Sequence, residues 1–507
     1  MDYSVIPSPV LSVLDELKKR NYQGHIVGGC VRDIFLGREP KDWDVTTNAK
    51  PEEVLAIFPD SFYENDFGTV GVKVAPFHKD GRLDREHDVI EITTYRTESA
   101  YSDRRRPDQV SFVMSLPEDL SRRDFTMNAI ALEVRESDPS AEEISRVVDI
   151  IDPFHGQEDI RQKLIRTVGN PEQRFGEDAL RMMRAVRLYA ELRDANDETP
   201  SNWKIDEPTI EAAQKHAGLL AHVSRERVRD EFSRIILSHS PSEGVELLRT
   251  TRLLEEIIPE LVQGVGIGQN LHHTYTVYEH NLSALKHCPS RSLEVRLASL
   301  LHDIGKPKSK RGDGYRSTFY NHDHIGARMT KDILHRLRYP LSVIAKATLL
   351  VDNHLFYYNV GEVTEASVRR LIRRVGLENM KDLMDVRIAD RLGSGVPKAK
   401  PYKLRHLEYM IEKVSKDPVS VKMLAINGTS LMSDLGMAPG PKIGAILDVL
   451  LSEVIEDPSQ NSKETLLARA QVLSQEDLAT LRDKAKEVIE EKRADDDHGI
   501  KNRHKVA

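Results

Sequence analysis

Cysteine is nearly absent from this chain of 507 residues, which contains only Cys30 and Cys288. Two cysteines are too few for a disulfide framework, so the sequence argues against a disulfide-bonded secreted domain and predicts a reducing, cytoplasmic setting. No apolar run approaches the roughly 20 residues that a membrane-spanning helix needs. The first residues, MDYSVIPSPV, lack the positive and apolar regions of a secretory signal. We therefore expect a soluble protein of the cytoplasm.

An excess of positive charge is also missing. The chain has 73 Lys and Arg against 81 Asp and Glu, a net charge of −8, so its overall charge does not indicate a nucleic-acid-binding protein. Such binding depends on local basic surface, however, and basic clusters occur at 104–106, at 122–123 and at Arg181, Arg184 and Arg187. Any one of these clusters, taken alone, is typical of a solvated surface.

The length predicts several domains. Residues 1–150 alternate short β-like runs, such as VGVKVAPF and DVIEITTYR, with one or two helical stretches, which predicts an α+β head with a small mixed sheet. The rest is predicted to be all-α, with polar connections at 193–202 and 393–403. The expected boundaries are a neck at 151–265, a histidine-rich domain at 266–396, a tail at 397–490 and a disordered end at 491–507.

The stretch HIVGGCVRDIFLGREPKDWDVTT, residues 25–47, places two carboxylates one residue apart. In a strand, side chains at i and i+2 share a face, so Asp42 and Asp44 are predicted to point the same way. Two carboxylates that close together suit a divalent cation, which offsets their mutual repulsion. Glu91 lies among β-branched residues and could add a third carboxylate from a neighbouring strand. Together these residues predict a two-metal site.

The glycines of the same stretch suit a phosphate. Gly28 and Gly29 would let the backbone approach a triphosphate closely, and a helix that begins near Val31 would direct free N–H groups toward it. Arg32, in the first turn of that helix, could add charge-assisted hydrogen bonds.

This stretch resembles the signature of the polymerase-β-like nucleotidyltransferases. More narrowly, it is similar to class II tRNA nucleotidyltransferases (CCA-adding enzymes) and the related bacterial poly(A) polymerases. Three further stretches match the same family in the same order and bring the resemblance to about half the chain: RPDQVSF…LPEDLSRRDFTMNAIA (106–131), DPFHGQEDIRQKLIRTVGNPEQRFGEDALRMMRAVR (152–187) and VSRERVRDEF (223–232).

The resemblance implies residue roles and substrates. It makes Asp42 and Asp44 the ligands of Mg²⁺, with Glu91 as the third carboxylate, and it makes Gly29 and Arg32 contacts of the triphosphate. It further implies a nucleotide-binding arginine at Arg122 or Arg123, a motif completed by Asn128, and the substrates CTP, ATP and tRNA.

The stretch EDALRMMR has a chemical logic of its own. Asp178 and Arg181, three residues apart, are expected to share a helix face, where a carboxylate beside a guanidinium group can pair with the edge of cytosine or adenine. This would select C and A without a nucleic-acid template, although such a pair is also typical of a simple helix salt bridge. Arg184 and Arg187 continue the face and could meet phosphates or the primer end.

A second group of candidate ligands follows in residues 266–396. Neutral imidazoles together with carboxylates bind divalent metals well, and the sequence places such residues on successive predicted helices: His280, His302, Asp303, His322, His354 and Asp390. The adjacent His-Asp pair resembles the HD-domain metal-dependent phosphohydrolases. The resemblance implies a divalent metal (Mg²⁺, Mn²⁺ or Ni²⁺) and hydrolysis of a phosphate ester. The fused head suggests a 2′,3′-cyclic phosphate or a phosphomonoester at an RNA end as the substrate.

The segment LAINGTSLMSDLGMAPGPKIGAILDVLLSEVI, residues 424–455, resembles a helix-hairpin-helix around its LGMAPGPKIG turn. Backbone N–H groups in such a turn can meet phosphates, so we expect a tail that contacts tRNA. A plain pair of packed helices explains the same pattern.

The function expected from the whole sequence is template-independent addition of C and A to the 3′ end of tRNA. A poly(A) polymerase and an enzyme adding only A or only CC carry the same motifs and stay open, although the loop between Arg96 and Arg122 argues against CC-only addition. Alarmone synthetase-hydrolases have the opposite domain order, and protein uridylyltransferases would end in ligand-sensing domains. A catalytically dead RNA-binding protein is disfavoured because Asp42, Asp44 and Glu91 are all present.

Overall fold

The computed structural model describes residues 5–65, 68–77, 87–99, 109–136, 146–193, 202–269, 275–312, 316–356, 358–395, 402–415, 421, 424–483, 497, 501 and 503–505. The chain divides into two compact units: Met1–Asp352 with Ala389–Gly395, and Asn353–Ile388 with Val396–Ala507. Within the described ranges, no helix combines the length and the apolar character that crossing a bilayer requires.

A seven-stranded mixed sheet forms the head, with strand order β3-β4-β5-β2-β1-β8-β9. Its strands are β1 (Gly24–Val27), β2 (Trp43–Thr47), β3 (Ser61–Asn65), β4 (Thr69–Val74), β5 (Asp88–Thr94), β8 (Ala131–Glu136) and β9 (Arg146–Ile151). Strand β2 runs parallel to β5, whereas the other neighbours are antiparallel. The predicted mixed sheet is confirmed, with the two quoted β-like runs present as β4 and β5.

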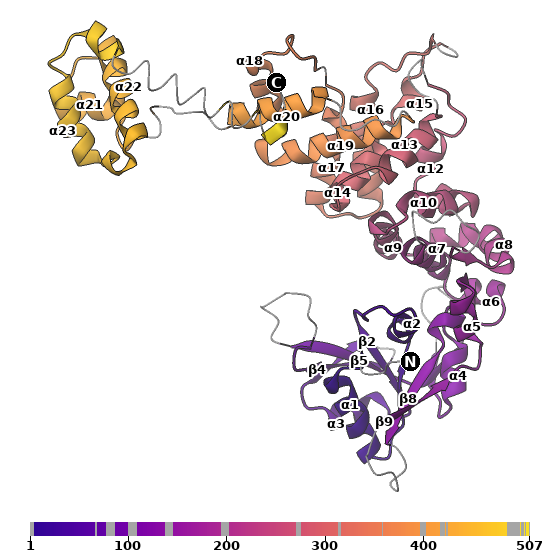
Figure 1. Cartoon of the computed structure of the whole chain (residues 1–507). Coiled ribbons are helices and arrows are strands. Elements are labelled where there is room, and N and C mark those ends of the chain that lie inside the picture. Colours follow the sequence, from indigo (N-terminus) through magenta and orange to yellow (C-terminus); the bar gives the residue numbers. More distant parts are fainter. Residues whose placement is uncertain are drawn as a thin grey trace. The chain divides into compact units, whose positions relative to one another are not determined.

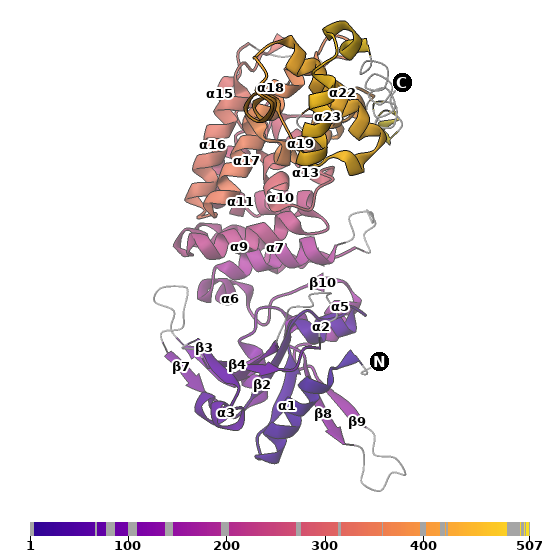
Figure 2. The same ribbon diagram turned by 90° about the vertical axis from the view of Figure 1, so that its left-hand side faces the viewer.

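Alternation of apolar and polar residues assigns the two faces of this sheet. Trp43 and Val45 of β2 and Ile90 and Ile92 of β5 are buried in the main head core. Helices α1 (Ser8–Lys19) and α3 (Pro51–Ile57) cover that face (Figure 2) and contribute to the same core. The alternating residues of β2 and β5, which include both strand carboxylates, consequently belong to the opposite face.

The remaining head elements are α2 (Gly29–Phe35), the hairpin of β6 (Arg96–Ser99) and β7 (Gln109–Phe112), α4 (Leu116–Ser121), the 3₁₀ turn η2 (Thr126–Asn128) and α5 (Gly156–Arg161). Of these, α2, η2 and α5 contribute buried apolar residues to the main core. A second, smaller core joins Val27 of β1 and Tyr95 to Leu116 and Leu120 of α4. The loop carrying the predicted cluster 104–106 lies outside the described residues.

Helices make up the rest of the first unit. They are α6 (Pro171–Glu177), α7 (Leu180–Leu192), α8 (Glu207–His216), η3 (Ala217–His222), α9 (Arg225–Leu237), α10 (Pro241–Thr250), α11 (Leu253–Ile257), α12 (Pro259–Val262), α13 (Val277–Lys286), α14 (Leu293–Leu301), α15 (Lys306–Ser309), α16 (His322–Arg336) and α17 (Leu341–Asn353). A short parallel pair, β10 (Leu164–Ile165) with β11 (Lys204–Ile205), precedes α8. Helices α7 and α9 lie between the head sheet and α13–α16 (Figure 1).

One hydrophobic core runs through these helices without a break. It extends from Phe175 in α6 to Ala347 in α17 and includes Ile258 and Tyr278, on either side of the expected boundary at 265/266. The neck helices and the histidine-rich helices of the first unit therefore share one packed core.

The second unit contains α18 (Glu365–Val375), η5 (Leu377–Asn379), most of α19 (Met380–Gly393), α20 (Tyr402–Ser415), α21 (Gly428–Leu435), α22 (Pro441–Glu456), η7 (Pro458–Gln460) and α23 (Lys463–Leu473). One core joins α18, α19 and α20, and another joins α21, α22 and α23. The segment predicted as a helix pair is present as α21 and α22. Asn427 caps α21, and Gly436 ends it in the left-handed conformation at φ 66°.

Most of the segment predicted to be disordered, 491–507, lies outside the described residues, so the prediction stays open. Two of its described residues contact α20: Asp497 forms an ion pair with Lys413 at 3.0 Å, and His504 Nε2 lies 2.6 Å from Glu412 Oε2. Most of the predicted connections at 193–202 and 393–403 lies outside the described residues.

We predict that Gly156→Ala destabilises the head by about 1–3 kcal/mol, as overpacking substitutions do. A Cβ atom at Gly156 would lie 2.2 Å from the Thr126 carbonyl oxygen and 2.8 Å from Ile130 Cγ1. Urea unfolding of the full chain measures the change. Gly218→Ala is the matched control, because a Cβ there meets open space. Equal unfolding midpoints for both variants would contradict the packing around η2 and α5.

Candidate active sites

The head carboxylates lie on adjacent strands. Asp44 of β2 is aligned with Glu91 of the parallel strand β5, one step from the pair Trp43 and Ile90. The expected neighbouring-strand position of Glu91 is therefore present. The predicted strand position of Asp42 is wrong. Strand β2 begins at Trp43, and Asp42 is exposed immediately before it. The chain leaves the sheet at this point, so period-two alternation does not fix the direction of the Asp42 side chain.

The glycine turn lies directly against Asp44. Gly28 adopts φ +86°, and a Cβ atom there would lie 2.9 Å from Asp44 Oδ2 and 3.5 Å from Arg123 Nη1. Helix α2 begins at Gly29, two residues earlier than expected. Burial, reinforced by the Asp44 carboxylate, raises the pKa of the Cys30 thiol to about 12, so this thiol stays protonated. The turn thus leaves a space beside a carboxylate that a side chain would otherwise fill, which suits a cation or a phosphate.

Arg32 is held by the motif that carries Asn128. Its Nη1 donates to Asn128 Oδ1 at 3.1 Å, and its Nε donates to Asp33 Oδ1 at 2.9 Å. Asn128 Nδ2 in turn donates to Asp124 Oδ1 at 3.1 Å. The predicted triphosphate contact and the predicted motif residue are therefore joined in one hydrogen-bonded chain.

Asp119, which the sequence analysis did not select, holds the arginine pair. Its side chain is fully buried, and its carboxylate lies 2.8 Å from Arg122 Nη2 and 3.4 Å from Arg123 Nη2. Thr46 Oγ1, on the strand that carries Asp44, donates to it at 3.1 Å. Burial alone would raise the pKa of Asp119, but the two arginines outweigh this and lower it. The sequence signal was an acidic residue three and four positions before the arginines, at the spacing of a helix ion pair.

Asp124, also not selected, connects the head to the neck. Its Oδ2 accepts from Arg184 Nε at 2.7 Å, and its Oδ1 accepts from the Phe125 backbone N–H at 2.8 Å as well as from Asn128. Burial alone would raise its pKa, but Arg184, the Asn128 amide and Arg181 hold it at about 2. Arg184 is thus committed to a head carboxylate rather than directed freely at solvent.

The expected shared helix face of Asp178 and Arg181 is wrong. Asp178 lies between α6 and α7 in an extended conformation, φ −139° and ψ 105°, where its Oδ1 accepts from the Leu180 N–H at 3.1 Å. Its Oδ2 accepts from Arg227 Nη2 at 2.7 Å. Arg181 instead donates to Glu177 Oε2 at 2.6 Å and to the Arg122 carbonyl oxygen at 3.1 Å. Asp178 lies outside both helices, after the end of α6 and before α7, so the i, i+3 argument fails here.

Arg187 packs inside the neck. It is buried and lies 2.7 Å from Glu231 of α9, with Glu191 at 3.4 Å. The Glu231 pair joins α7 to α9, whereas the Glu191 pair lies within α7. Arg187 thus has structural partners, and its predicted contact with phosphates or the primer end stays a prediction.

The second site gathers five of the six predicted ligands in the first unit. His280 Nε2 lies 3.0 Å from His302 Nε2, 3.2 Å from Asp303 Oδ2 and 3.3 Å from Asp390 Oδ1. His322 Nε2 reaches the other oxygen of Asp303 at 3.2 Å. They come from α13, the end of α14, α16 and α19, and four of the five are buried. His354 belongs to the second unit and stays a predicted ligand.

This cluster fits a divalent cation. Ligand atoms of His280, His302 and Asp303 all lie within 4.8 Å of one another. His302 Nδ1 donates to the Ser299 carbonyl oxygen at 2.9 Å, so the proton sits on Nδ1 and Nε2 is directed inward. Burial opposes a charged imidazole, but Asp303 and Asp390 raise the pKa of His302 to about 10. The carboxylates therefore attract positive charge, which protons or a bound cation can supply.

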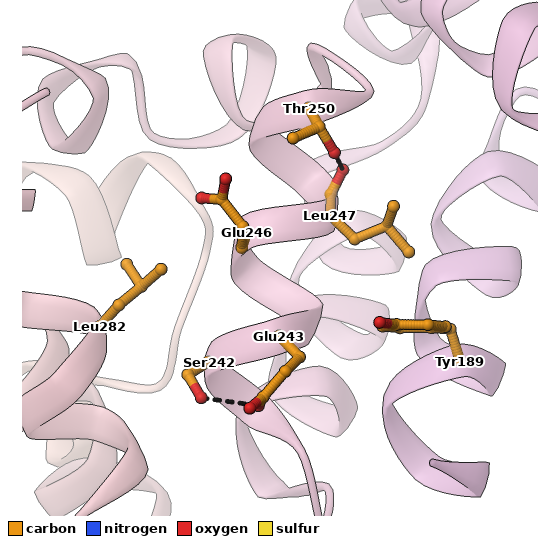
Figure 3. A pocket seen from close by; sticks show the side chains of 7 residues that line it. All are labelled: Tyr189, Ser242, Glu243, Glu246, Leu247, Thr250 and Leu282. Carbon is orange, nitrogen blue, oxygen red and sulfur yellow. Dashed lines mark hydrogen bonds between the residues drawn. The ribbon is translucent and has the colours of Figure 1, made fainter. Parts of the chain in front are cut away.

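A separate cavity of about 400 Å³ opens beside α10. Tyr189 of α7 and Leu282 of α13 approach α10 from opposite sides (Figure 3). The other lining residues are Ser242, Glu243, Glu246, Leu247 and Thr250, and Ser242 Oγ donates to Glu243 at 2.7 Å. Its lining shares no residue with either predicted site.

Three family matches cover most of the chain. Residues 24–166 match the family described as Poly A polymerase head domain, and residues 202–263 match Probable RNA and SrmB-binding site of polymerase A. Residues 324–470 match tRNA nucleotidyltransferase domain 2, putative.

Several similar proteins are CCA-adding enzymes. The one from Geobacillus thermodenitrificans is 32% identical over 459 residues, covering 90% of this chain and 95% of the relative. That from Limosilactobacillus reuteri is 30% identical over 470 residues, with 92% and 97% covered. A solved structure, the Bacillus stearothermophilus CCA-adding enzyme in complex with CTP, has a TM-score of 0.56 at 28% identity and covers 92% of this chain and 98% of that one.

We predict that Asp124→Asn lowers the free energy of unfolding by about 2 kcal/mol near pH 7. The pKa of Asp124 is lowered from 3.8 to about 2 by its donors. Its contribution is therefore complete above about pH 4 and is lost as the pH falls through about 2, so the difference between wild type and variant should shrink only at the acid end. Chemical unfolding at several pH values measures this.

Asp149→Asn is the control for this prediction, because Asp149 pairs with Arg135 on the exposed surface. Solvent screens that pair, so its loss should change stability much less. A difference for Asp124→Asn that vanishes already between pH 7 and pH 5 would contradict the assigned contacts.

Proposed function

The chain belongs to the family of CCA-adding enzymes and poly(A) polymerases, and from that premise we propose that it adds C and A nucleotides to the 3′ end of tRNA from CTP and ATP. The 3′-oxygen of the RNA attacks the α-phosphorus of the nucleotide, the bond to the β-phosphate breaks, and pyrophosphate leaves. No nucleic-acid template takes part, and the reaction belongs to the cytoplasm.

The observation that supports this most strongly is the register of Asp44 with Glu91 beside the turn at Gly28. In the proposal, Asp42 and Asp44 hold Mg²⁺ and Glu91 completes the carboxylate set as a two-metal site. The bound cations supply Lewis-acid activation of the 3′-hydroxyl and offset the charge of the leaving pyrophosphate.

Arginines orient the triphosphate in this proposal. Gly28 and Gly29 let the backbone approach the phosphates, Arg32 contacts them, and Arg122 and Arg123 add charge-assisted hydrogen bonds. Asp119 forms ion pairs with both guanidinium groups and holds them in place. Little side-chain entropy is therefore lost when they bind the triphosphate.

Base selection through Asp178 and Arg181 carries an energetic condition. Each residue has another partner, Arg227 for Asp178 and Glu177 for Arg181. Pairing with cytosine or adenine must therefore replace these ion pairs, and a base that offers the wrong donor and acceptor pattern would leave them intact. The existing contacts would thus raise the selectivity for a matching base.

A second activity, hydrolysis of a phosphate ester, is favoured by the convergence of His280, His302, Asp303 and Asp390. In the proposal these residues, together with His322 and His354, hold a divalent cation (Mg²⁺, Mn²⁺ or Ni²⁺). Such a cation supplies a hydroxide nucleophile at neutral pH when bound. A 2′,3′-cyclic phosphate or a phosphomonoester at an RNA end is the substrate class that suits an enzyme acting on RNA termini.

We predict sequential addition of C, C and A, followed by a stop, in a primer-extension assay. Three tRNA transcripts, ending at the discriminator base, at C and at CC, are each supplied with CTP, ATP or both. Unlimited addition of A would instead identify a poly(A) polymerase, and a single A on the CC-ended transcript alone would identify an A-adding enzyme. Addition that stops after CC would identify a CC-adding enzyme.

Asp42→Ala tests the residue assignment in the same assay. We expect a loss of addition of at least about 1,000-fold, because the cation loses a ligand, with tRNA affinity retained. Asp60→Ala removes an exposed carboxylate elsewhere in the head and should leave the rate unchanged. Wild-type addition by Asp42→Ala would exclude Asp42 as a metal ligand.

We predict that His302→Ala combined with Asp303→Ala abolishes phosphate-ester hydrolysis and leaves nucleotide addition intact. The assay follows release of phosphate, or ring opening, from RNA ending in a phosphomonoester or a 2′,3′-cyclic phosphate, with Mg²⁺, Mn²⁺ or Ni²⁺.

Because both residues are buried, Asp390→Asn serves as a milder second variant, and calorimetric titration of Mn²⁺ reports the metal separately. Wild-type hydrolysis by both variants, with unchanged Mn²⁺ affinity, would assign the activity elsewhere in the chain.

A further inference from the structure

Helix α18 presents one apolar face and one face of arginines. Val368 is buried in one core with Leu404 and Leu407 of α20, and the partly buried Ile372 packs against the same core. The opposite side carries four exposed arginines within two turns: Arg369, Arg370, Arg373 and Arg374. At about 100° per residue these four positions span roughly 140° of the helix circumference. We call this surface the arginine face.

The arginine face has fewer carboxylate partners than the arginines of the neck. Neck arginines pair with acidic residues, as Arg184 does with Asp124 and Arg187 with Glu231. On α18, Arg369 pairs with Glu365 at 3.2 Å, and Arg370 donates to the Ser367 hydroxyl at 2.8 Å. Within the described part of the chain, no ion pair involves Arg373 or Arg374.

This arrangement is electrostatically unfavourable for the helix alone. Arg369 and Arg373 are four residues apart, as are Arg370 and Arg374, and like charges at that spacing destabilise a helix. The whole chain is acidic, with a net charge of −8, so a concentrated positive surface is not explained by composition. A polyanion bound along the face would remove the repulsion.

The chemistry of the face selects the kind of polyanion. Guanidinium groups bind phosphates through paired N–H donors, and four of them along two turns match a series of phosphates rather than a single one. A helix that inserts into a membrane surface needs a free apolar face, whereas the apolar face of α18 is packed on α20. A nucleic-acid backbone therefore fits the surface better than a lipid bilayer does.

We propose that the arginine face of α18 binds the phosphate backbone of the tRNA substrate, outside the 3′ end that reacts. This rests on the proposed function for the identity of the RNA. The contact carries affinity and position but no sequence information. It makes binding more dependent on salt, because each neutralised phosphate releases counterions.

The test replaces Arg373 and Arg374, which form no ion pair with the residues that the structure describes, in the full chain. We expect R373Q/R374Q to weaken binding of a tRNA transcript about tenfold near physiological salt, and to reduce the slope of log affinity against log salt by about one to two. Fluorescence anisotropy measures both quantities. At saturating tRNA, kcat and the KM for CTP should be unchanged, because the proposed contact is made to the RNA backbone outside the reacting 3′ end.

A matched control separates this contact from loss of charge in general. K18Q/K19Q removes the same two positive charges from exposed positions of α1 and should leave the salt slope unchanged. Thermal unfolding verifies that both variants fold.

Two results would overturn the proposal. One is an unchanged affinity and salt slope for folded R373Q/R374Q, and the other is weakened binding to phosphatidylserine vesicles without any change for tRNA. RNA binding is measured without catalysis, so failure of nucleotide addition would count against the proposed function while leaving this result interpretable.

Discussion

The buried carboxylate of Asp124 is the contact on which the arrangement of the first unit depends. It accepts hydrogen bonds from Arg184 of the neck and from Asn128 of the head, and Asn128 accepts one from Arg32. A position beside the glycine turn is thereby connected to α7 through three consecutive hydrogen bonds. A buried charge without a partner costs several kcal/mol. These hydrogen bonds therefore hold the head and the neck in one geometry more firmly than apolar contact alone would.

Ion pairs also determine what the neck can offer a nucleotide. Asp178, Arg181 and Arg187 all have protein partners, so the neck does not present a row of free charges. In the proposed base selection, a nucleotide can bind these side chains only if its own hydrogen bonds replace the existing ion pairs with equally good geometry. Specificity of this kind arises from the cost of an unsatisfied mismatch as much as from the gain of a match.

Features that depend on the local periodicity of apolar residues could be predicted from the sequence. Features that depend on contacts with residues distant in the sequence could not. Strands β4 and β5 followed from alternation, and the neighbouring-strand position of Glu91 followed from its β-branched surroundings. Asp178 was misplaced because a helix-like run of residues contained a cap, which only backbone angles reveal. Asp119 and Asp124 were missed because the sequence analysis assigned roles to the neighbouring arginines and did not ask which carboxylates would pair with them.

The same limit explains the domain boundaries and the second site. The predicted ligands are spread over more than a hundred residues, and the sequence drew attention to them because a histidine next to an aspartate is rare enough to be noticed individually. No local pattern, in contrast, marks where one core ends and another begins, and the shared core crosses 265/266 without a change in composition. The contacts of Asp497 and His504 with α20 were equally invisible, since charged residues are typical of both disorder and ion pairing.

The uninterrupted core from Phe175 to Ala347 has a consequence for how such a protein can change over evolutionary time. Two proposed chemistries use one body, so the helices around His280 and His302 also contribute the apolar surface that keeps α7 in place. A lineage could lose the metal ligands by single substitutions and keep its polymerase, but it could not discard those helices. The histidine-rich region would then persist as a scaffold after its own chemistry had gone.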